Sequence, residues 1–494
     1  MKIRRCVVST LALLSLLEAS AKPRTKSLIV DPTDRRQQVL FIGTDMERSQ
    51  DHLSYATNKE EVAEWCFKDI DFNVCRFSYD KHQEMVEGES RCEEYYANCV
   101  EAMQLIRKAN PKVEFWGTLK SDYYGYGNPP KNNLPQWICD YEYVVSDEKN
   151  SGSERGVGSK EVKGKAVVHS LDTKKYAYFL VDFLEHFHTK GLTIKYLSTG
   201  KEWTQFLTAK RTKEVIEQML PELERRSVPT PRFVDASTWS TAQGAKWVDD
   251  VTRLGFESYY YGFCTHNYNS HGTANYQDMV ERANAITTPN MWEEPQYYSF
   301  ASETGGATMG PNHGVDAATS ISSLLSSFSH KCEIFADGMH GELIFEIFSR
   351  ELANESRAVY FSRKNGYVGT RLSNYYALQS HGNFFEDGMY YLGAERMGLN
   401  NHISTMQFAN DDQLYIAVIN KDKRAVNNFR ISLNDTNYEG AVRRHEMSEQ
   451  RVKVEGDLDG EYYDLTLANG ELIVTLAANS INFFKINYNR IVQP

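Results

Sequence analysis

Two glutamates, Glu202 and Glu303, are the strongest candidates for chemistry in this sequence. Glu202 follows an apolar run in YLSTGKEW, and Glu303 follows another in YYSFASETGG. A carboxyl group kept protonated can assist a leaving oxygen, while an ionised one attacks the anomeric carbon of a sugar. The pair therefore predicts cleavage of a glycosidic bond, with retention of configuration where the two carboxyl groups are about 5 to 5.5 Å apart.

Short strands and helices must bring these glutamates together. Between residues 38 and 350, short apolar runs alternate with longer segments whose apolar residues recur every three or four positions. This alternation is typical of a parallel α/β architecture. Strands are predicted at 39–43, 72–77, 113–118, 194–198, 232–236, 257–263, 297–302 and 343–348, and helices include 59–68, 95–108, 176–188 and 213–226.

Eight strands in this order suit a (β/α)8 TIM barrel with inserted loops. Glu202 then follows the fourth strand and Glu303 follows the seventh, and these strands lie opposite each other across the barrel mouth. Active sites of such barrels form at the carboxyl ends of the strands. The alternative for either glutamate is an ion pair with a neighbouring base and no further role, and the same alternative applies to Glu346 in the eighth strand.

The pattern changes near residue 385 to apolar alternation interrupted by Asn, Asp and Gly, as in QLYIAVINKD and EYYDLTLANG. Period-two patterning with such turn residues predicts a C-terminal antiparallel β-sandwich. The apolar segment at 27–30 is a candidate extra strand for it. We therefore divide the chain into a signal peptide (1–21), a linker with this strand (22–37), a catalytic barrel (38–385) and a β-sandwich domain (386–494).

The amino terminus has the features of an export signal. Lys2, Arg4 and Arg5 precede the apolar run at 6–17, and Ala19 and Ala21 supply the small residues of a cleavage site. That run is shorter than the roughly 20 residues that a spanning helix needs. We expect a secreted or periplasmic protein with no membrane span. Seven cysteines remain after cleavage, so at least one thiol is left without an internal partner.

The overall charge limits the partners that we expect. The chain has 55 basic and 66 acidic residues and a net charge of −11, without a long basic run, which argues against nucleic acid as a partner. The exception is the segment at 150–165, which carries Arg155, Lys160, Lys163 and Lys165. It is either a basic rim that attracts an anionic polysaccharide or a solvated loop.

Several stretches resemble the clan A glycoside hydrolases, and most of all family 30 and its relatives. They are DFNVCRFSYD, FWGTLKSDYYGYGNPP, GLTIKYLSTGKEW, HNY, FASETGG and LAANSINFFKI. The resemblance implies a barrel joined to a β-sandwich and a retaining mechanism in which Glu202 is the acid/base and Glu303 the nucleophile. It also implies that Arg76 lies beneath the nucleophile and that His266 and Tyr268 line the subsite of the reacting sugar.

The sequence departs from this family pattern immediately before Glu202. Clan A enzymes usually carry Asn there, and this chain has Lys201. A nearby ammonium lowers the pKa of a carboxyl group, which is the wrong direction for a general acid. Either Lys201 points away from Glu202, or it recognises an unusual substituent on the substrate, or the assignment of Glu202 is displaced.

Three further residues near strand ends are candidates for binding a sugar. Trp116 and Trp203 offer flat faces for stacking, and Asp235 offers a carboxylate for sugar hydroxyls. The alternatives are packing for the tryptophans and turn capping for the aspartate. We expect neither a metal nor a cofactor, because the signatures of zincins, NTPases, dehydrogenases and serine hydrolases do not occur.

Together these observations predict a secreted retaining glycoside hydrolase that acts on a β-linked polysaccharide or oligosaccharide. The substrate is either an algal galactan, such as agarose, porphyran or a carrageenan, or a glucan or xylan. Lys201 and the basic insertion favour an anionic substrate. The alternative is a non-catalytic carbohydrate-binding protein that kept the glycosidase barrel.

Overall fold

The computed structural model describes most of the chain after the predicted leader. The described residues are 26–120, 133–145, 164–202, 204, 206–267, 275–304, 321–349, 357–361, 363, 366–434, 437–448 and 460–490. The predicted signal peptide, Trp203, Tyr268 and most of the basic insertion lie outside them. In the part of the chain that is described, no helix combines the length and the apolar character needed to cross a bilayer.

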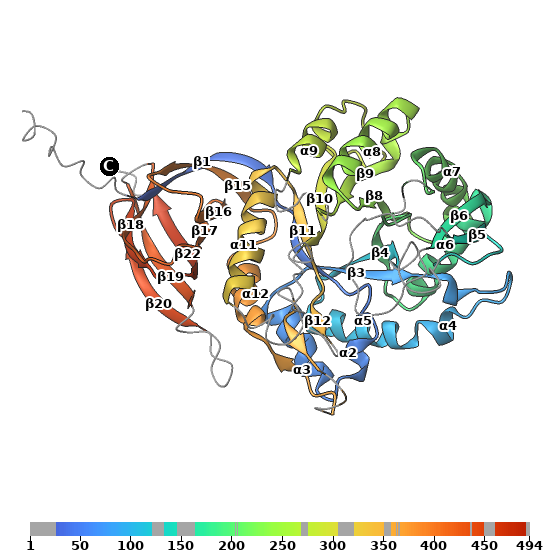
Figure 1. Ribbon diagram of the computed structural model, residues 1–494, viewed down its shortest axis with the longest axis horizontal. Coiled ribbons are helices and arrows are strands. Elements are labelled where there is room, and N and C mark those ends of the chain that lie inside the picture. Colours follow the sequence, from blue (N-terminus) through green and yellow to red (C-terminus); the bar gives the residue numbers. More distant parts are fainter. Residues whose placement is uncertain are drawn as a thin grey trace, which may run out of the picture.

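Eight parallel strands close into a barrel, and they follow one another around it in chain order (Figure 1). They are β2 (Phe41–Asp45), β3 (Val74–Tyr79), β4 (Glu114–Leu119), β7 (Ile194–Leu197), β8 (Arg232–Thr238), β9 (Tyr260–Thr265), β10 (Tyr298–Thr304) and β11 (Gly341–Phe345). The predicted (β/α)8 barrel is confirmed. The sixth strand begins later than predicted, because residues Glu257–Tyr259 form a short 3-10 helix.

Helices cover the outside of the barrel, as the apolar periodicity predicted. The main ones are α5 (Ala97–Ala109), α6 (Thr173–Thr189), α7 (Ala209–Arg226), α8 (Thr241–Leu254), α9 (Gln277–Asn284), α11 (Ile321–Ala336) and α12 (Ser373–Phe384). Shorter helices α2 (His52–Tyr55), α3 (Lys59–Glu64) and α4 (Cys92–Tyr95) lie between β2 and α5. The helix predicted at 59–68 is therefore α3, and it continues as a π-helical turn over Trp65–Asp69.

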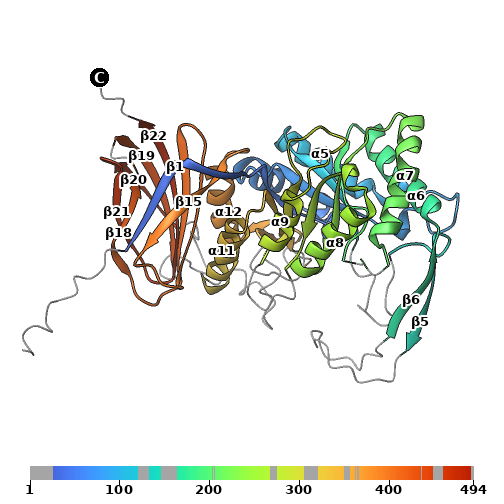
Figure 2. The same ribbon diagram turned by 90° about the horizontal axis from the view of Figure 1, so that it is seen from above.

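Part of the insertion after β4 forms a hairpin. Its strands, β5 (Cys139–Val145) and β6 (Gly164–Leu171), pair antiparallel with each other and extend away from the barrel (Figure 2). A small sheet of β12 (Phe348–Ser349), β13 (Val359–Tyr360) and β14 (Thr370–Arg371) follows β11.

The inside of the barrel is packed rather than hollow. Its core consists largely of aromatic and branched side chains, one or two from each strand: Phe41, Val74, Trp116, Tyr196, Val234, Tyr261, Cys264, Tyr298, Phe300 and Leu343. The ring of Phe41 stacks on Phe300 with centroids 5.0 Å apart. The packed interior lies directly beneath the polar residues at the carboxyl ends of the strands and supports them.

The carboxyl-terminal segment folds into a separate, mostly antiparallel β domain with its own hydrophobic core. Its strands are β15 (Tyr390–Met397), β16 (Ile403–Ala409), β17 (Gln413–Asn420), β18 (Val426–Leu433), β19 (Tyr438–Ser448), β20 (Glu461–Leu467), β21 (Glu471–Leu476) and β22 (Ser480–Arg490). Together with β1 (Ser27–Gln38), they form one hydrogen-bonded sheet in the order β20-β19-β22-β17-β16-β15-β1-β18-β21. A three-residue turn joins its edge strands β20 and β21, so the sheet curls back on itself.

The strand β1 (Ser27–Gln38) belongs to this sheet although it precedes the barrel in sequence. It pairs antiparallel with β15 and parallel with β18, and Leu28 and Val30 enter the core of the β domain. The candidate strand at 27–30 therefore lies in the sheet. Helices α11 and α12 lie between the barrel and the β domain in both views (Figures 1 and 2).

Candidate active site

Glu202 and Glu303 both lie at the carboxyl end of the barrel. Glu303 is the penultimate residue of β10, with 2% of its side chain exposed. Glu202 lies in the loop after β7, and its backbone has a φ of 59°, in the left-handed region that non-glycine residues seldom adopt. Its N–H donates to the carbonyl of Ser237 in β8 at 2.9 Å. The neighbouring strand thus holds Glu202 in a sparsely populated conformation, which is common at functional positions.

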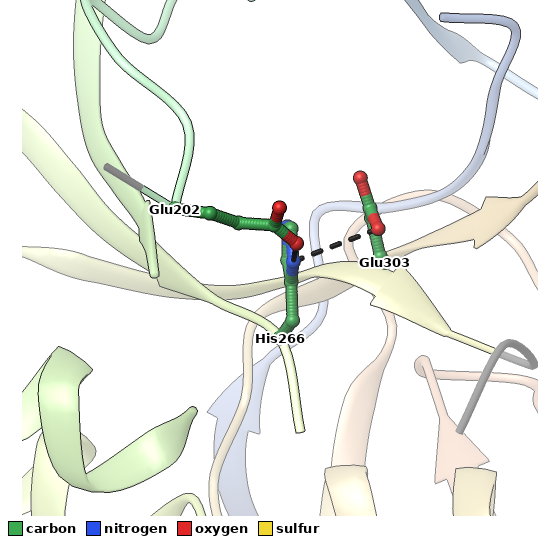
Figure 3. Close-up of side chains that lie close together, drawn as sticks. All are labelled: Glu202, His266 and Glu303. Carbon is green, nitrogen blue, oxygen red and sulfur yellow. Dashed lines mark hydrogen bonds and ion pairs between the residues drawn. The ribbon is translucent and has the colours of Figure 1, made fainter. Parts of the chain in front are cut away.

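A histidine joins the two glutamates (Figure 3). Nδ1 of His266 lies 2.9 Å from Oε1 of Glu202 and 3.5 Å from Oε2 of Glu303. One carboxylate oxygen from each glutamate and a ring nitrogen of His266 all lie within 4.8 Å of one another. His266 directly follows β9, and its backbone N–H donates to the carbonyl of Thr238 at 2.8 Å. The two predicted carboxyl groups therefore share one site.

Two buried cations contact the other oxygen of Glu303. Arg76 in β3 donates through Nη2 to Oε1, and Nζ of Lys201 forms an ion pair with the same oxygen. Burial by itself raises the pKa of Glu303, but the combined effect of His266, Lys201 and Arg76 is larger and lowers it well below its ordinary value. Glu303 is therefore ionised at neutral pH.

Lys201 points toward Glu303 and away from solvent. Its Nζ lies 2.5 Å from Oε2 of Glu47, and 1% of its side chain is exposed. Burial tends to lower the pKa of Lys201, but Glu303 and Glu47 raise it above its ordinary value, so the ammonium stays charged. Of the alternatives for Lys201, the observed geometry matches the first, a side chain that points away from Glu202, because its ammonium contacts Glu303 and Glu47.

No family model matches the sequence, and no curated protein matches it. The structure, in contrast, matches solved structures over nearly its whole length. A family 30 endoxylanase from Clostridium papyrosolvens C71 aligns over 93% of this chain and 100% of its own, at 11% identity and a TM-score of 0.66. A family 30 xylanase C catalytic domain from Talaromyces cellulolyticus aligns over 93% and 100%, at 12% identity and a TM-score of 0.62. An endo-β1,6-glucanase aligns over 93% and 94%, at 12% identity and 0.59.

The chain has the fold of a family 30 glycoside hydrolase. The resemblance seen in the sequence motifs therefore extends to the whole architecture, from the closed barrel to the β domain that β1 completes. At identities this low, the likeness concerns the fold alone.

Two acidic residues of this site escaped the sequence analysis. Asp45 ends β2 and accepts hydrogen bonds from Arg76, and Glu47 follows two residues later and pairs with Lys201. Both side chains are fully buried. Burial raises the pKa of Asp45 to about 7 against the opposing effect of Arg76. Their position in the sequence could have identified them, because Asp45 and Glu47 follow the predicted first strand in the same way as Glu202 follows the fourth.

Two other predicted residues make structural contacts. Trp116 is fully buried in the barrel interior, where its Nε1 donates to Oγ of Ser198 at 3.0 Å, so its ring faces other aromatics rather than an open surface. Asp235 is also buried and accepts hydrogen bonds from the N–H and Oγ1 of Thr199, both at 2.8 Å. The contacts of Trp116 match the packing alternative, whereas Asp235 lies within β8 and binds the residue that follows Ser198 after β7 rather than capping a turn.

Glu346 matches the alternative given for it, an ion pair with a neighbouring base. It lies 3.2 Å from Nη1 of Arg357 and accepts a hydrogen bond from Oγ of Ser49 at 2.7 Å. Trp203 and Tyr268 lie outside the described residues.

A metal ion would have to compete with the resident cations. Among the described residues, two groups bring their ligand atoms within 4.8 Å of one another: Glu202 with His266 and Glu303, and Asp45 with Glu47 and Glu303. Glu303 belongs to both, and its Oε1 already contacts Arg76 and Lys201. A divalent ion placed there would meet two fixed positive charges in a low-dielectric setting, which opposes binding.

Proposed function

We propose that this protein is a retaining glycoside hydrolase that cleaves a β-linked polysaccharide. One observation carries the proposal: oxygens of Glu202 and Glu303 come within 4.8 Å of each other at the carboxyl end of the barrel. Retaining glycosidases hold their two carboxyl groups about 5 to 5.5 Å apart, and inverting enzymes hold them about 6.5 to 9.5 Å apart. The family 30 fold supports the same reaction class.

In the proposed first step, Glu303 attacks the anomeric carbon and forms a bond from its carboxylate oxygen to that carbon. The glycosidic bond breaks with its electron pair on the leaving oxygen, which takes the proton of Glu202. In the second step, water gives a proton to Glu202 and attacks the anomeric carbon. The ester bond then breaks, and its electron pair returns to Glu303 as a carboxylate.

The surroundings of the two glutamates support these roles. The low pKa of Glu303 keeps the nucleophile ionised. Glu202 is partly exposed at 10% of its side chain, which leaves it in reach of a leaving group and of water. Nδ1 of His266 can accept a hydrogen bond from the protonated carboxyl group of Glu202 or donate one to the carboxylate, depending on the tautomer.

The test is turnover of a polysaccharide panel by the wild-type protein and by Glu303→Gln. The amide cannot form the glycosyl ester, so we expect the release of reducing ends to fall by about 10³-fold or more. Glu217→Gln, on the outer surface of α7, serves as the matched control and should keep wild-type turnover. Wild-type turnover in Glu303→Gln would remove Glu303 from its role.

The panel should contain xylan and β-glucans together with agarose, porphyran and carrageenan. Three similar structures are named as xylanases and one as an endo-β1,6-glucanase, which supports the first group. The argument for an anionic galactan is now weaker, since Lys201 is buried against two carboxylates and only the basic insertion remains.

We include export in the proposal because of the predicted leader. Amino-terminal sequencing of the mature protein, with Lys22 as its first residue, would support it.

A second candidate function is sugar binding without turnover. It is favoured by the two cations on Oε1 of Glu303, which stabilise the carboxylate and weaken it as a nucleophile. Binding in a glycan array, with no release of reducing ends from any bound polymer, would support this function over the enzyme.

A further inference from the structure

The two carboxylate oxygens of Glu303 have different surroundings. Oε1 contacts the guanidinium of Arg76 and the ammonium of Lys201. Oε2 faces Nδ1 of His266 at 3.5 Å, and the same nitrogen lies 2.9 Å from Glu202. The oxygen on the side of Glu202 is therefore the one that can approach a sugar carbon between the two glutamates.

Lys201 is fixed in this position from three sides. Its ammonium contacts Glu303, lies 2.5 Å from Oε2 of Glu47, and lies 5.5 Å from the ring centroid of Phe345. With 1% of its side chain exposed, it cannot reach a substrate without leaving two buried carboxylates behind. Such a separation is costly, because it leaves buried carboxylates without their cation in a low-dielectric setting.

We propose that Lys201, held by Glu47, is a positioning residue that fixes Oε1 of Glu303 and leaves Oε2 as the attacking atom. In the second step, the same ammonium makes the Glu303 carboxylate a better leaving group when the glycosyl-enzyme is hydrolysed. This inference rests on the proposed function. It assigns to Lys201 and Glu47 a control over the balance between the two chemical steps.

The physical argument follows the charge of Glu303 through the cycle. When the bond from Oε2 to the anomeric carbon forms and the glycosidic bond breaks, the carboxylate becomes a neutral ester. When water attacks and the ester bond breaks, the electron pair returns to the carboxylate and a proton passes to Glu202. The ammonium of Lys201 stabilises the carboxylate and not the ester, so it slows the attack and speeds the release.

In the described part of the chain, the charged groups around Glu303 come from several elements and include the permanent cations Lys201 and Arg76. They are Asp45 and Glu47 from β2 and its loop, Arg76 from β3, Lys201 and Glu202 from the loop after β7, and His266 after β9. Removing the Lys201 charge leaves Arg76 to keep Glu303 ionised, so catalysis continues with a more basic nucleophile.

The experiment compares wild type with Lys201→Met and Lys201→Arg on the substrate found in the panel, using acid quench and intact-protein mass spectrometry. An opposite charge nearby shifts a carboxyl pKa by about 1–3, so release should slow by about tenfold or more in Lys201→Met. We expect kcat and KM to fall together and a covalent glycosyl adduct to accumulate at least tenfold over wild type. Lys201→Arg should keep the charge and show no such adduct.

Two further variants keep the experiment decisive. Glu47→Gln combined with Lys201→Met removes both buried charges, which avoids leaving Glu47 unpaired and should preserve folding. The adduct should accumulate in this double variant as well. Lys195→Met, on the surface of β7, is the matched control and should behave as wild type.

Loss of kcat/KM without an adduct in folded Lys201 variants would overturn the inference, and so would wild-type kinetics in Lys201→Met. Either result leaves the proposed function intact if the wild type is active and Glu303→Gln is not. Absence of turnover by the wild type on every polymer would overturn the proposed function and this inference together.

Discussion

At the scale of single residues, the candidate site gathers side chains from the carboxyl ends of different barrel strands. Glu202 and Glu303 stand just past or at the ends of barrel strands, and the structure brings them together with Arg76 and His266. Lys201 shows where the sequence stops being informative. Its neighbour in sequence is Glu202, but its ion-pair partners are 102 and 154 residues away, and only tertiary structure selects them.

The role of Glu202 can be separated from that of Glu303 at this scale. Glu202→Ala removes the group that deprotonates water, but it leaves the nucleophile and its cations in place. A small anion such as azide needs no base and fits the space that the carboxyl group vacates. We therefore expect azide to restore turnover of an aryl glycoside in Glu202→Ala by about tenfold or more, with a glycosyl azide as product. Chromatography of the products checks this, and Glu303→Gln should show no rescue.

At the scale of elements, the alternation of strands and helices predicted the barrel because each strand is a short apolar run bounded by helical periodicity. The ends of strands were less predictable, as the delayed start of β9 after a 3-10 turn shows. The apolar pattern also predicted strands in the β domain, but it could not predict their order in the sheet. The strand β1 pairs with β15 and β18, which are separated from it in sequence by the whole barrel.

One buried polar network links elements of the barrel to the β domain. Glu342 in β11 lies 2.7 Å from Nζ of Lys331 in α11 and accepts a hydrogen bond from His381 of α12 at 2.8 Å. The ring of His381 also lies 2.8 Å from the hydroxyl of Tyr415 in β17. Oγ1 of Thr304, which follows Glu303, donates to Glu342 at 3.0 Å.

Glu342→Gln tests the contribution of this network to stability. It leaves the buried Lys331 ammonium without its carboxylate, so we expect the free energy of unfolding to fall by about 3–5 kcal/mol. Glu101→Gln, which breaks the more exposed pair with Lys59, should lower the free energy of unfolding much less, because solvent screens that pair. Denaturant unfolding measures both. Equal stability of wild type and Glu342→Gln would contradict a stabilising role.

The same residue predicts a pH dependence. Burial tends to raise the pKa of Glu342, but the opposing effect of Lys331 and His381 is larger. The net result lowers the pKa from 4.5 to about 2. A carboxyl group with a depressed folded-state pKa stabilises the protein fully above its unfolded pKa and loses that contribution as pH falls through the folded value. Stability of the wild type should thus decline between pH 4.5 and 2, and Glu342→Gln should lack this part of the decline.

At the scale of the whole molecule, a filled barrel carries the site and a curled sheet packs beside it through α11 and α12 (Figure 1). Composition and length allowed such an arrangement, but the contacts between the two parts depend on residues that the sequence analysis did not single out, such as Lys331, His381 and Tyr415. These residues looked ordinary in sequence because their role arises only where the two parts meet.

The most direct measurement of the central claim is the anomeric configuration of the first product, followed by proton NMR during hydrolysis of a β-linked polymer. If Glu202 and Glu303 act on the same acetal by two displacements, the β-anomer appears first and the α-anomer grows in later by mutarotation. Initial formation of the α-anomer would contradict the account, because a single displacement by water would then replace the attack of Glu303.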